Sequence, residues 1–98
     1  MPAYIVAHID VTDPVAFETY RAQAPAVIAA HGGRYLVRGG AFEMLEGPAV
    51  PPRQVVLEFA DMARLQAFYR SPEYQALAAI RHRAAHGSLL AMEGVALA

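Results

Sequence analysis

The sequence predicts one α+β domain, residues 1–98, in which helices cover one face of a four-stranded antiparallel sheet. Three observations predict this class. The chain of 98 residues is long enough for one domain and too short for two. Apolar residues make up 56% and charged residues 17%, which excludes disorder and allows a single hydrophobic core. Short segments with the alternation of strands flank longer segments with the spacing of helices.

The first half of the chain predicts a strand, a helix and a short strand. Residues 4–11 alternate with apolar side chains on both faces, which favours a central strand. Residues 13–14, an aspartate before a proline, start a helix that glycines at 32–33 end. Pro25 lies inside this helix, so we expect a kink or a break near residues 23–24. Residues 35–38 form the next strand, and Gly39 and Gly40 allow a bulge or bend after it.

The second half predicts a strand, two helical pieces and a last strand. A loop rich in glycine and proline leads to residues 54–59, which have clear strand alternation. Asp61 caps one helix, and Ser71 with the following proline caps another. The pair at residues 86–87 closes the second of these helices. Residues 88–93 form the last strand, and residues 94–98 form a tail.

The order β-α-β-β-α-β predicts the split βαβ, or ferredoxin-like, arrangement with strand order 4-1-3-2. The expected helix-facing core consists of alternate residues of the two central strands, namely Ile5, Ala7, Ile9, Val55, Leu57 and Phe59. The expected open face is apolar too, with Val6, Leu36, Val56, Leu90 and Met92 beside His8, Arg38 and Glu58. Exposed apolar surface of this size indicates an interface, so we expect a two-fold homodimer formed through the open face.

Four segments of the chain resemble a known family. They are GGRYLVRGG at 32–40, LEG at 45–47, RQVVLEF at 53–59 and FYRSPEY at 68–74. In this order and spacing they are similar to the domain-of-unknown-function family 1330, over nearly the whole chain. Many members carry tryptophan where this chain has Phe68, a change that preserves an aromatic packing role.

The resemblance implies a fold and an assembly but carries no established reaction. It implies a dimeric α+β barrel. Proteins of that wider group include cofactor-free monooxygenases, muconolactone isomerases and haem-binding peroxidases. Fold analogy alone cannot transfer any of these activities.

His8 and Glu58 are the candidate catalytic residues, because both are expected on the open face of neighbouring strands. A carboxylate that orients an imidazole forms a general base. The alternative is a polar pair that is buried and satisfied at the dimer interface. A one-residue slip in register would exchange the two faces of the sheet and move this pair into the pocket.

The candidate substrate-binding residues are Arg38, Arg53, Tyr69 and Arg81. Arginine forks suit a carboxylate or an enolate. The hairpin arginines are Arg34, Arg38 and Arg53, and the alternative for them is structural ion pairing with Glu43, Glu46 or Glu58. Arg81 borders an apolar helix stripe, where it either needs a partner or extends to solvent. The tyrosine hydroxyls at 20, 69 and 74 either line a pocket or are hydrogen-bonded within the core.

Composition excludes several classes of chemistry. There is no cysteine, so no disulfide, thiolate nucleophile or thiolate-held zinc. There is no lysine, so no Schiff-base or P-loop lysine. The net charge of −1, spread over interleaved signs, predicts no nucleic-acid partner, and no apolar run is long enough to span a membrane. His82 and His86 have helical metal-ligand spacing but lack a third ligand, so we expect a solvated helix face and no metal.

Two functions remain open from the residues alone. The first is a cofactor-independent enzyme that acts on a small acidic organic molecule between helices and sheet. The second is a non-catalytic ligand-binding or accessory homodimer. A third, haem binding, would need His82 or His86 inside the pocket. The lack of cysteine and of an export signal leads us to expect a cytoplasmic protein.

Overall fold

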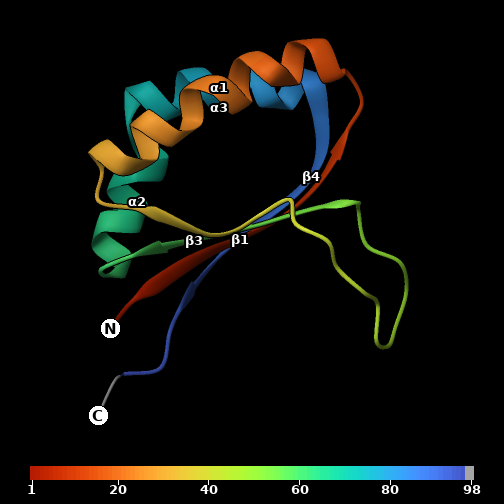
Figure 1. Ribbon diagram of the computed structural model, residues 1–98. Coiled ribbons are helices and arrows are strands. Elements are labelled where there is room, and N and C mark those ends of the chain that lie inside the picture. The colour runs from red at the N-terminus through yellow and green to blue at the C-terminus, as the bar shows by residue number, and fades with distance from the viewer. Residues whose placement is uncertain (97–98) are drawn as a thin grey trace.

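The computed structural model describes residues 1–96 and contains four strands and three helices (Figure 1). In chain order they are β1 (Ala3–Val11), α1 (Pro14–Ala30), β2 (Arg34–Arg38), β3 (Arg53–Phe59), α2 (Met62–Arg70), α3 (Pro72–Ala84) and β4 (Ala85–Glu93). The strands form one antiparallel sheet in the order β2-β3-β1-β4, as predicted. The last two residues of the predicted tail lie outside the described residues.

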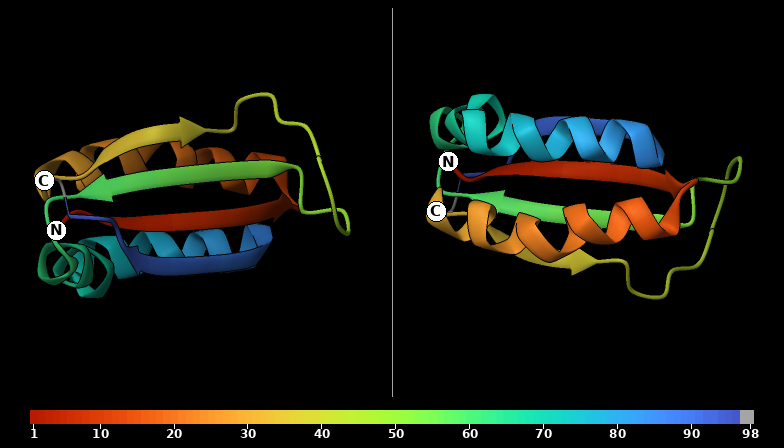
Figure 2. Two further views of the ribbon diagram at one scale, coloured as in Figure 1. Left: turned by 90° about the horizontal axis from the view of Figure 1, so that it is seen from below. Right: turned by 90° about the horizontal axis from the view of Figure 1, so that it is seen from above.

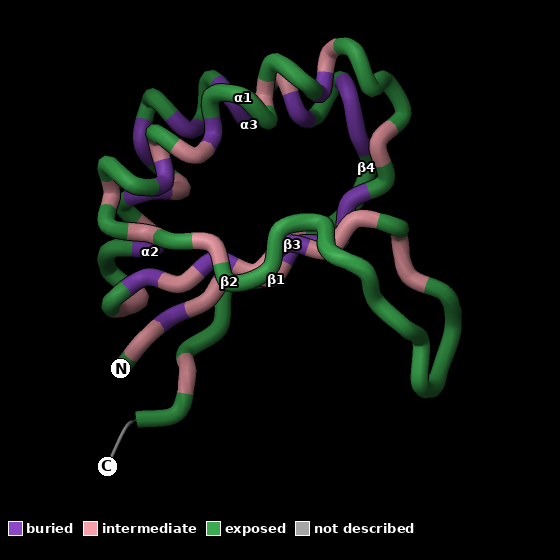
Figure 3. Tube along the Cα trace, in the orientation of Figure 1, coloured by how far each residue is buried: buried purple, intermediate pink, exposed green. Residues whose placement is uncertain are grey.

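The helices cover one face of this sheet and leave the other face open (Figure 1). Helix α1 lies over the β2 side and α3 over the β4 side, while α2 stands at the end where β1 begins (Figure 2). The connection 39–52 extends from the opposite end of the sheet and is almost wholly exposed, without a continuation of β2 (Figures 1 and 3). None of the helices in this part of the chain is long and apolar enough to cross a membrane.

The core fills the space between the helices and the covered face of the sheet (Figure 3). Antiparallel pairing places Ile5 opposite Leu57 and Ala7 opposite Val55. All the predicted helix-facing residues are buried, so that expectation is confirmed. Helices α2 and α3 add Phe68 and other side chains that are almost fully buried, which closes the core.

Strand β2 contains a bulge that reverses its alternation. Tyr35 pairs with Leu57, but Val37 pairs with Val56 and Arg38 with Val55. One extra residue between paired positions turns the following side chains to the other face. Arg38 therefore lies on the covered face, and its predicted place on the open face is wrong.

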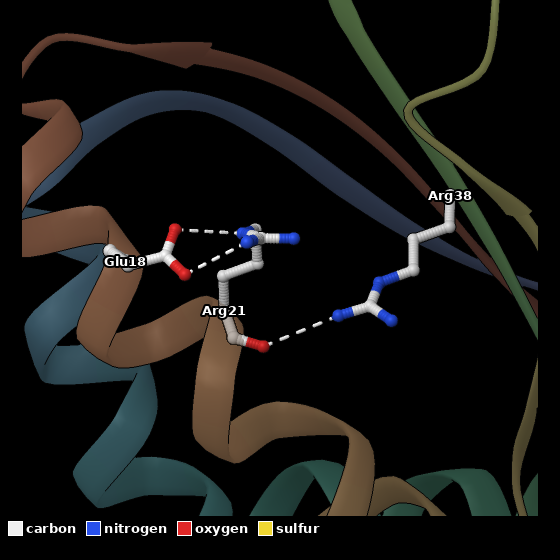
Figure 4. Close-up of polar contacts among 3 residues, drawn as sticks. All are labelled: Glu18, Arg21 and Arg38. Carbon is white, nitrogen blue, oxygen red and sulfur yellow. Dashed lines mark hydrogen bonds and ion pairs between the residues drawn. The ribbon is translucent and has the colours of Figure 1, made fainter.

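Of the kink or break predicted near residues 23–24, the break does not occur, because helix α1 continues through Pro25. The Asp13 carboxylate caps its first turn by accepting from the Ala16 N–H, at 3.1 Å. A proline has no N–H, so the carbonyl of Arg21, four residues earlier, loses its usual helical partner. Arg38 Nη2 donates to that carbonyl at 3.3 Å (Figure 4). The bulge in β2 thus brings a donor to the acceptor that Pro25 leaves free.

Helix α3 passes directly into β4, which begins at Ala85 rather than at residue 88. His86 and Gly87 therefore belong to β4, and the prediction that they close a helix is wrong. A side chain at position 87 would collide with the His8 carbonyl oxygen of the neighbouring strand. Gly87 has φ +154°, so the close approach of these strands depends on a glycine here. The predicted caps Asp61 and Ser71 are both confirmed.

Candidate functional site

A cavity opens between the covered face of the sheet and the helices, and we call it the central cavity. Its volume is about 30 Å³. It is lined by Ile5, Ala7, Ile9, Phe17, Tyr20, Arg21, Ile28, Tyr35, Arg53, Val55, Leu57, Tyr74 and Leu89. The sheet supplies most of its apolar wall, because inward-facing positions of β1 and β3 alternate with outward ones. The polar side chains in this lining are two arginines and three tyrosines.

Arg53 reaches the central cavity from the first position of β3. It pairs with Ile9, so its side chain shares the covered face. Its guanidinium carbon lies 5.5 Å from the centre of the Phe17 ring, a cation–π contact. Gly39 leaves space for the Arg53 side chain, because a Cβ added at position 39 would lie 2.7 Å from Arg53 Nη1. Arg53 Nε is buried and has no hydrogen-bond partner among residues 1–96.

Glu18, Arg21 and Arg38 form a charged group next to the cavity (Figure 4). Arg21 holds Glu18 through two hydrogen bonds of 2.8 and 2.9 Å. These bonds, with the charges of Arg21, Arg38 and Arg53, hold the pKa of the Glu18 carboxyl below its usual range. Three guanidinium groups therefore act on one carboxylate, and the local charge favours an anion.

Two tyrosines of the central cavity, Tyr20 and Tyr35, have hydroxyls whose pKa is raised. The Tyr20 and Tyr74 hydroxyls form a hydrogen bond of 2.8 Å. Burial, and then the neighbouring Tyr74, raise the pKa of Tyr20. Burial also raises the pKa of Tyr35, although the charges of Arg38 and Arg53 oppose this. The hydroxyls of Tyr20 and Tyr35 are therefore protonated near neutral pH and can donate hydrogen bonds, but they cannot act as bases there.

The structure does not bring His8 and Glu58 together within the protomer. Both lie on the open face, as predicted, but His8 is opposite Gln54 while Glu58 is opposite Tyr4. Four residues of strand separate the two positions, or roughly 13 Å. His8 Nδ1 is hydrogen-bonded to the Gln54 amide oxygen. Neither residue lines the central cavity.

Glu58 is instead paired with arginine. Arg34 lies directly opposite it on β2 and contacts it at 2.7 Å through both Nε and Nη2. The Arg34 hydrogen bond is the main reason that the pKa of Glu58 lies below its ordinary value. The structure thus shows an ion pair of Glu58 with arginine, which was the alternative considered for the hairpin arginines.

The four predicted substrate-binding residues divide between two places. Arg53 lines the central cavity and Arg38 lies beside it. Tyr69 and Arg81 line a different space of about 320 Å³, between α3 and β4, which we call the edge pocket. The residues that line the edge pocket are Tyr69, Arg81, His82, Ala85, His86, Gly87 and Leu89.

Two residues of the central cavity, Arg21 and Tyr35, were not predicted as candidates. The alternation of β2 could have indicated Tyr35, which faces inward opposite Leu57. For Arg21, the proline four residues later signals only a free backbone carbonyl and does not place its side chain. No group of three or more histidine, aspartate or glutamate side chains within residues 1–96 is placed to hold a metal ion.

The sequence matches a family model described as "Domain of unknown function (DUF1330)" over residues 2–95. The chain belongs to this family. The resemblance seen in the four sequence segments is therefore confirmed. No curated protein matches the sequence. Membership in DUF1330 gives no reaction, so the function must be argued from the site.

Several solved structures share the fold of this DUF1330 protein. A protein of unknown function from Rhodopseudomonas palustris has TM-score 0.73 and 19% identity, covering 98% of this chain and 84% of that one. SnoaB, a cofactor-independent oxygenase from Streptomyces nogalater, has TM-score 0.67 and 14% identity, covering 98% and 95%. A dimeric ferredoxin-like protein of unknown function from Jannaschia sp. CCS1 has TM-score 0.66 and 15% identity, covering 96% and 100%. At these identities the comparisons show a ferredoxin-like fold.

Proposed function

We propose that the protein is a homodimer in which each protomer binds a small organic acid at the central cavity, with Arg53 as the anchor of the acid group. One observation carries this proposal: the buried Nε of Arg53 has no hydrogen-bond partner within residues 1–96. A buried guanidinium N–H without an acceptor is costly, and a bound carboxylate would supply one.

The surroundings of Arg53 favour an anion with an apolar body. Arg21 and Arg38 add positive charge, and the Tyr35 hydroxyl is a protonated donor. The volume of about 30 Å³ is far below the roughly 300–1,000 Å³ of pockets that enclose drug-sized ligands. The acid group and a few more atoms would therefore enter, and the remainder would lie at the mouth unless side chains move.

Dimer formation is supported by the open face of the sheet. Exposed Val37, Leu90 and Met92 lie there together with half-buried Val6 and Val56. Apolar side chains grouped on one sheet face are typical of an interface. The Jannaschia protein, which has the same fold, is dimeric.

Catalysis without a cofactor is the second candidate function. It is favoured by the shared fold with SnoaB, a cofactor-independent oxygenase. Arginines and protonated phenols can stabilise a carboxylate or an enolate. However, no carboxylate or imidazole lines the central cavity in the described part of the chain. The substrate of such an enzyme would have to lose its proton without a base from this lining, so the geometry supports binding more directly than catalysis.

Titration with matched probes tests the proposal. Benzoate and benzyl alcohol share a ring, but only benzoate carries a charge. We expect benzoate to bind more tightly, and we expect Arg53→Met to weaken its binding about tenfold or more, as for a lost charged hydrogen bond. Calorimetry or amide NMR shifts would measure both. Arg70→Met, an exposed change of equal charge, is the control and should bind benzoate normally.

Equal binding of the two probes, or unchanged benzoate binding by Arg53→Met, would contradict an acid site at Arg53. Mass spectrometry of benzoate and other acids after incubation with the protein separates the two functions. An altered mass would support catalysis, and recovery of the intact acid would support binding alone.

A further inference from the structure

We infer that the edge pocket is a second anion site, separate from the central cavity, which binds a small molecule through carboxylate or phosphate oxygens held by Arg81. The pocket lies between α3 and β4, at the edge of the sheet that β4 forms. Nothing in the proposed function requires it.

Arg81 is a buried cation without a partner. Only 7% of the residue is exposed, so its side chain does not extend into solvent. Its Nε is buried and lacks a hydrogen-bond partner among residues 1–96. None of the three ion pairs formed within these residues includes it. A buried guanidinium that faces a pocket without a counter-charge points to a ligand that supplies one.

Ordinary structural roles do not account for Arg81. An arginine in the last turn of a helix often binds the free terminal carbonyls. Here the Ala84 carbonyl accepts instead from the backbone of Thr12, at 2.8 Å, and of Asp13, at 3.0 Å. The guanidinium carbon of Arg81 lies 5.8 Å from the Tyr20 ring centre. That contact stabilises the positive charge but gives Nε no acceptor.

The rest of the pocket suits an anion of small-molecule size. Its other polar side chains are Tyr69, His82 and His86, all capable of donating hydrogen bonds. No carboxylate lines the pocket within the described residues, so no acidic side chain of its wall competes with a ligand for Arg81. The volume of about 320 Å³ falls in the range of small-ligand sites, about 300–1,000 Å³.

The edge pocket and the central cavity are adjacent and share one lining residue, Leu89, but their arginines differ. Arg53 lines only the central cavity and Arg81 only the edge pocket. The open face, through which we propose the dimer forms, lies on the other side of the sheet. Substitution of Arg81 or of Arg53 therefore distinguishes binding at the edge pocket from binding at the acid site.

Titration of the 98-residue chain with inorganic phosphate and with acetate, at constant ionic strength, tests the inference. We expect a saturable shift of the backbone amide signals of residues 81–89 with at least one of the two anions. Arg81→Met should weaken that binding about tenfold or more. Arg83→Met has the same change of charge at an exposed position two residues away, and should bind as the wild type does.

Arg81→Lys guards against a folding defect in Arg81→Met, since it keeps the charge but loses the planar fork. We expect it to fold and to bind with intermediate affinity. The inference is overturned if neither anion gives saturable shifts, or if Arg81→Met and Arg83→Met respond alike. Arg53→Met should retain phosphate or acetate binding at residues 81–89, so failure at one site is distinguishable from failure at the other.

Discussion

Arginine stacking on aromatic rings organises the polar groups inside this protein. The guanidinium of Arg38 lies 4.7 Å from the Tyr35 ring centre, and those of Arg53 and Arg81 lie over Phe17 and Tyr20. A planar and weakly hydrated guanidinium suits such sites better than a compact, strongly hydrated ammonium group does. Because the chain contains arginine but no lysine, each of these stacked cations is a guanidinium.

The pairing of Glu58 with Arg34 predicts a specific dependence of stability on pH. The pKa of Glu58 is lower in the folded protein than its ordinary value, mainly because Arg34 donates to it. The folded state then binds fewer protons than the unfolded state near this pKa. The stabilisation is therefore complete above the unfolded pKa of about 4.3, and is lost as the pH falls through the lowered folded pKa.

Arg34→Gln should raise the pKa of Glu58 towards its ordinary value. The variant should also lose less stability than the wild type between about pH 5 and about pH 2. Carboxyl NMR titration measures the pKa, and urea denaturation at each pH measures the stability. Arg70→Gln removes an exposed charge elsewhere and should leave the Glu58 titration unchanged. If the Glu58 pKa is the same in Arg34→Gln and in the wild type, the ion pair is not its cause.

At the scale of elements, the bulge of β2 and the proline of α1 act on each other. The bulge turns Arg38 to the covered face, and Pro25 leaves the Arg21 carbonyl without a helical donor. The bond from Arg38 to that carbonyl joins the two elements beside the central cavity. The position of the candidate residue Arg38 thus depends on the bulge in β2 and on Pro25 in α1.

Pro25→Ala should increase the free energy of unfolding by about 1–3 kcal/mol, because proline is the poorest residue in a helix interior. The new amide N–H at position 25 would bond the Arg21 carbonyl in place of Arg38. Arg38→Met should therefore cost more stability in the wild type than in the Pro25→Ala protein, where only its contacts with Tyr35 and Glu18 are lost. Urea denaturation of the four proteins of this double-mutant cycle measures the coupling, expected at about 0.5 kcal/mol or more.

Additive effects of the two substitutions would contradict the link between Pro25 and Arg38. Arg64→Met is a suitable comparison, because Arg64 lies on α2 and pairs with Asp61. Its effect on stability should be the same with either residue at position 25.

At the scale of the whole molecule, the sheet has one face covered by helices and one left open (Figure 2). A chain of this length has little interior, so apolar residues beyond what the core holds must lie on its surface. Here exposed Val37, Leu90 and Met92 lie on the open face beside half-buried Val6 and Val56, which is why a second copy is the proposed partner.

Leu90→Glu should weaken the proposed dimer. Leu90 lies opposite Val6 on the open face and is 53% exposed in the protomer, so a buried carboxylate would enter the interface. Sedimentation equilibrium should show a dissociation constant raised about tenfold or more. Val15→Glu, at an 85% exposed position of α1, should leave the assembly unchanged. A monomeric wild type, or a Leu90→Glu protein that assembles normally, would contradict dimerisation through this face.

The sequence by itself determined the element order, the strand order and the covered face. Alternation over residues 4–11 and 54–59 correctly assigned the core positions, because the period of a strand is local. The helix caps Asp61 and Ser71 were also predicted correctly from the sequence, because a cap acts within one turn of its helix. The family followed from short segments in the right order.

Only the tertiary structure decided which side chains meet. Strand pairing offsets Glu58 from His8 by four positions, and alternation cannot reveal an offset along the strands. One extra residue in β2 moved Arg38 to the other face. The burial of Arg81 depends on the packing of α3 against α1 and β4, which no local pattern contains. Local periodicity fixes the face of each residue, whereas register, bulges and packing between layers fix its neighbours.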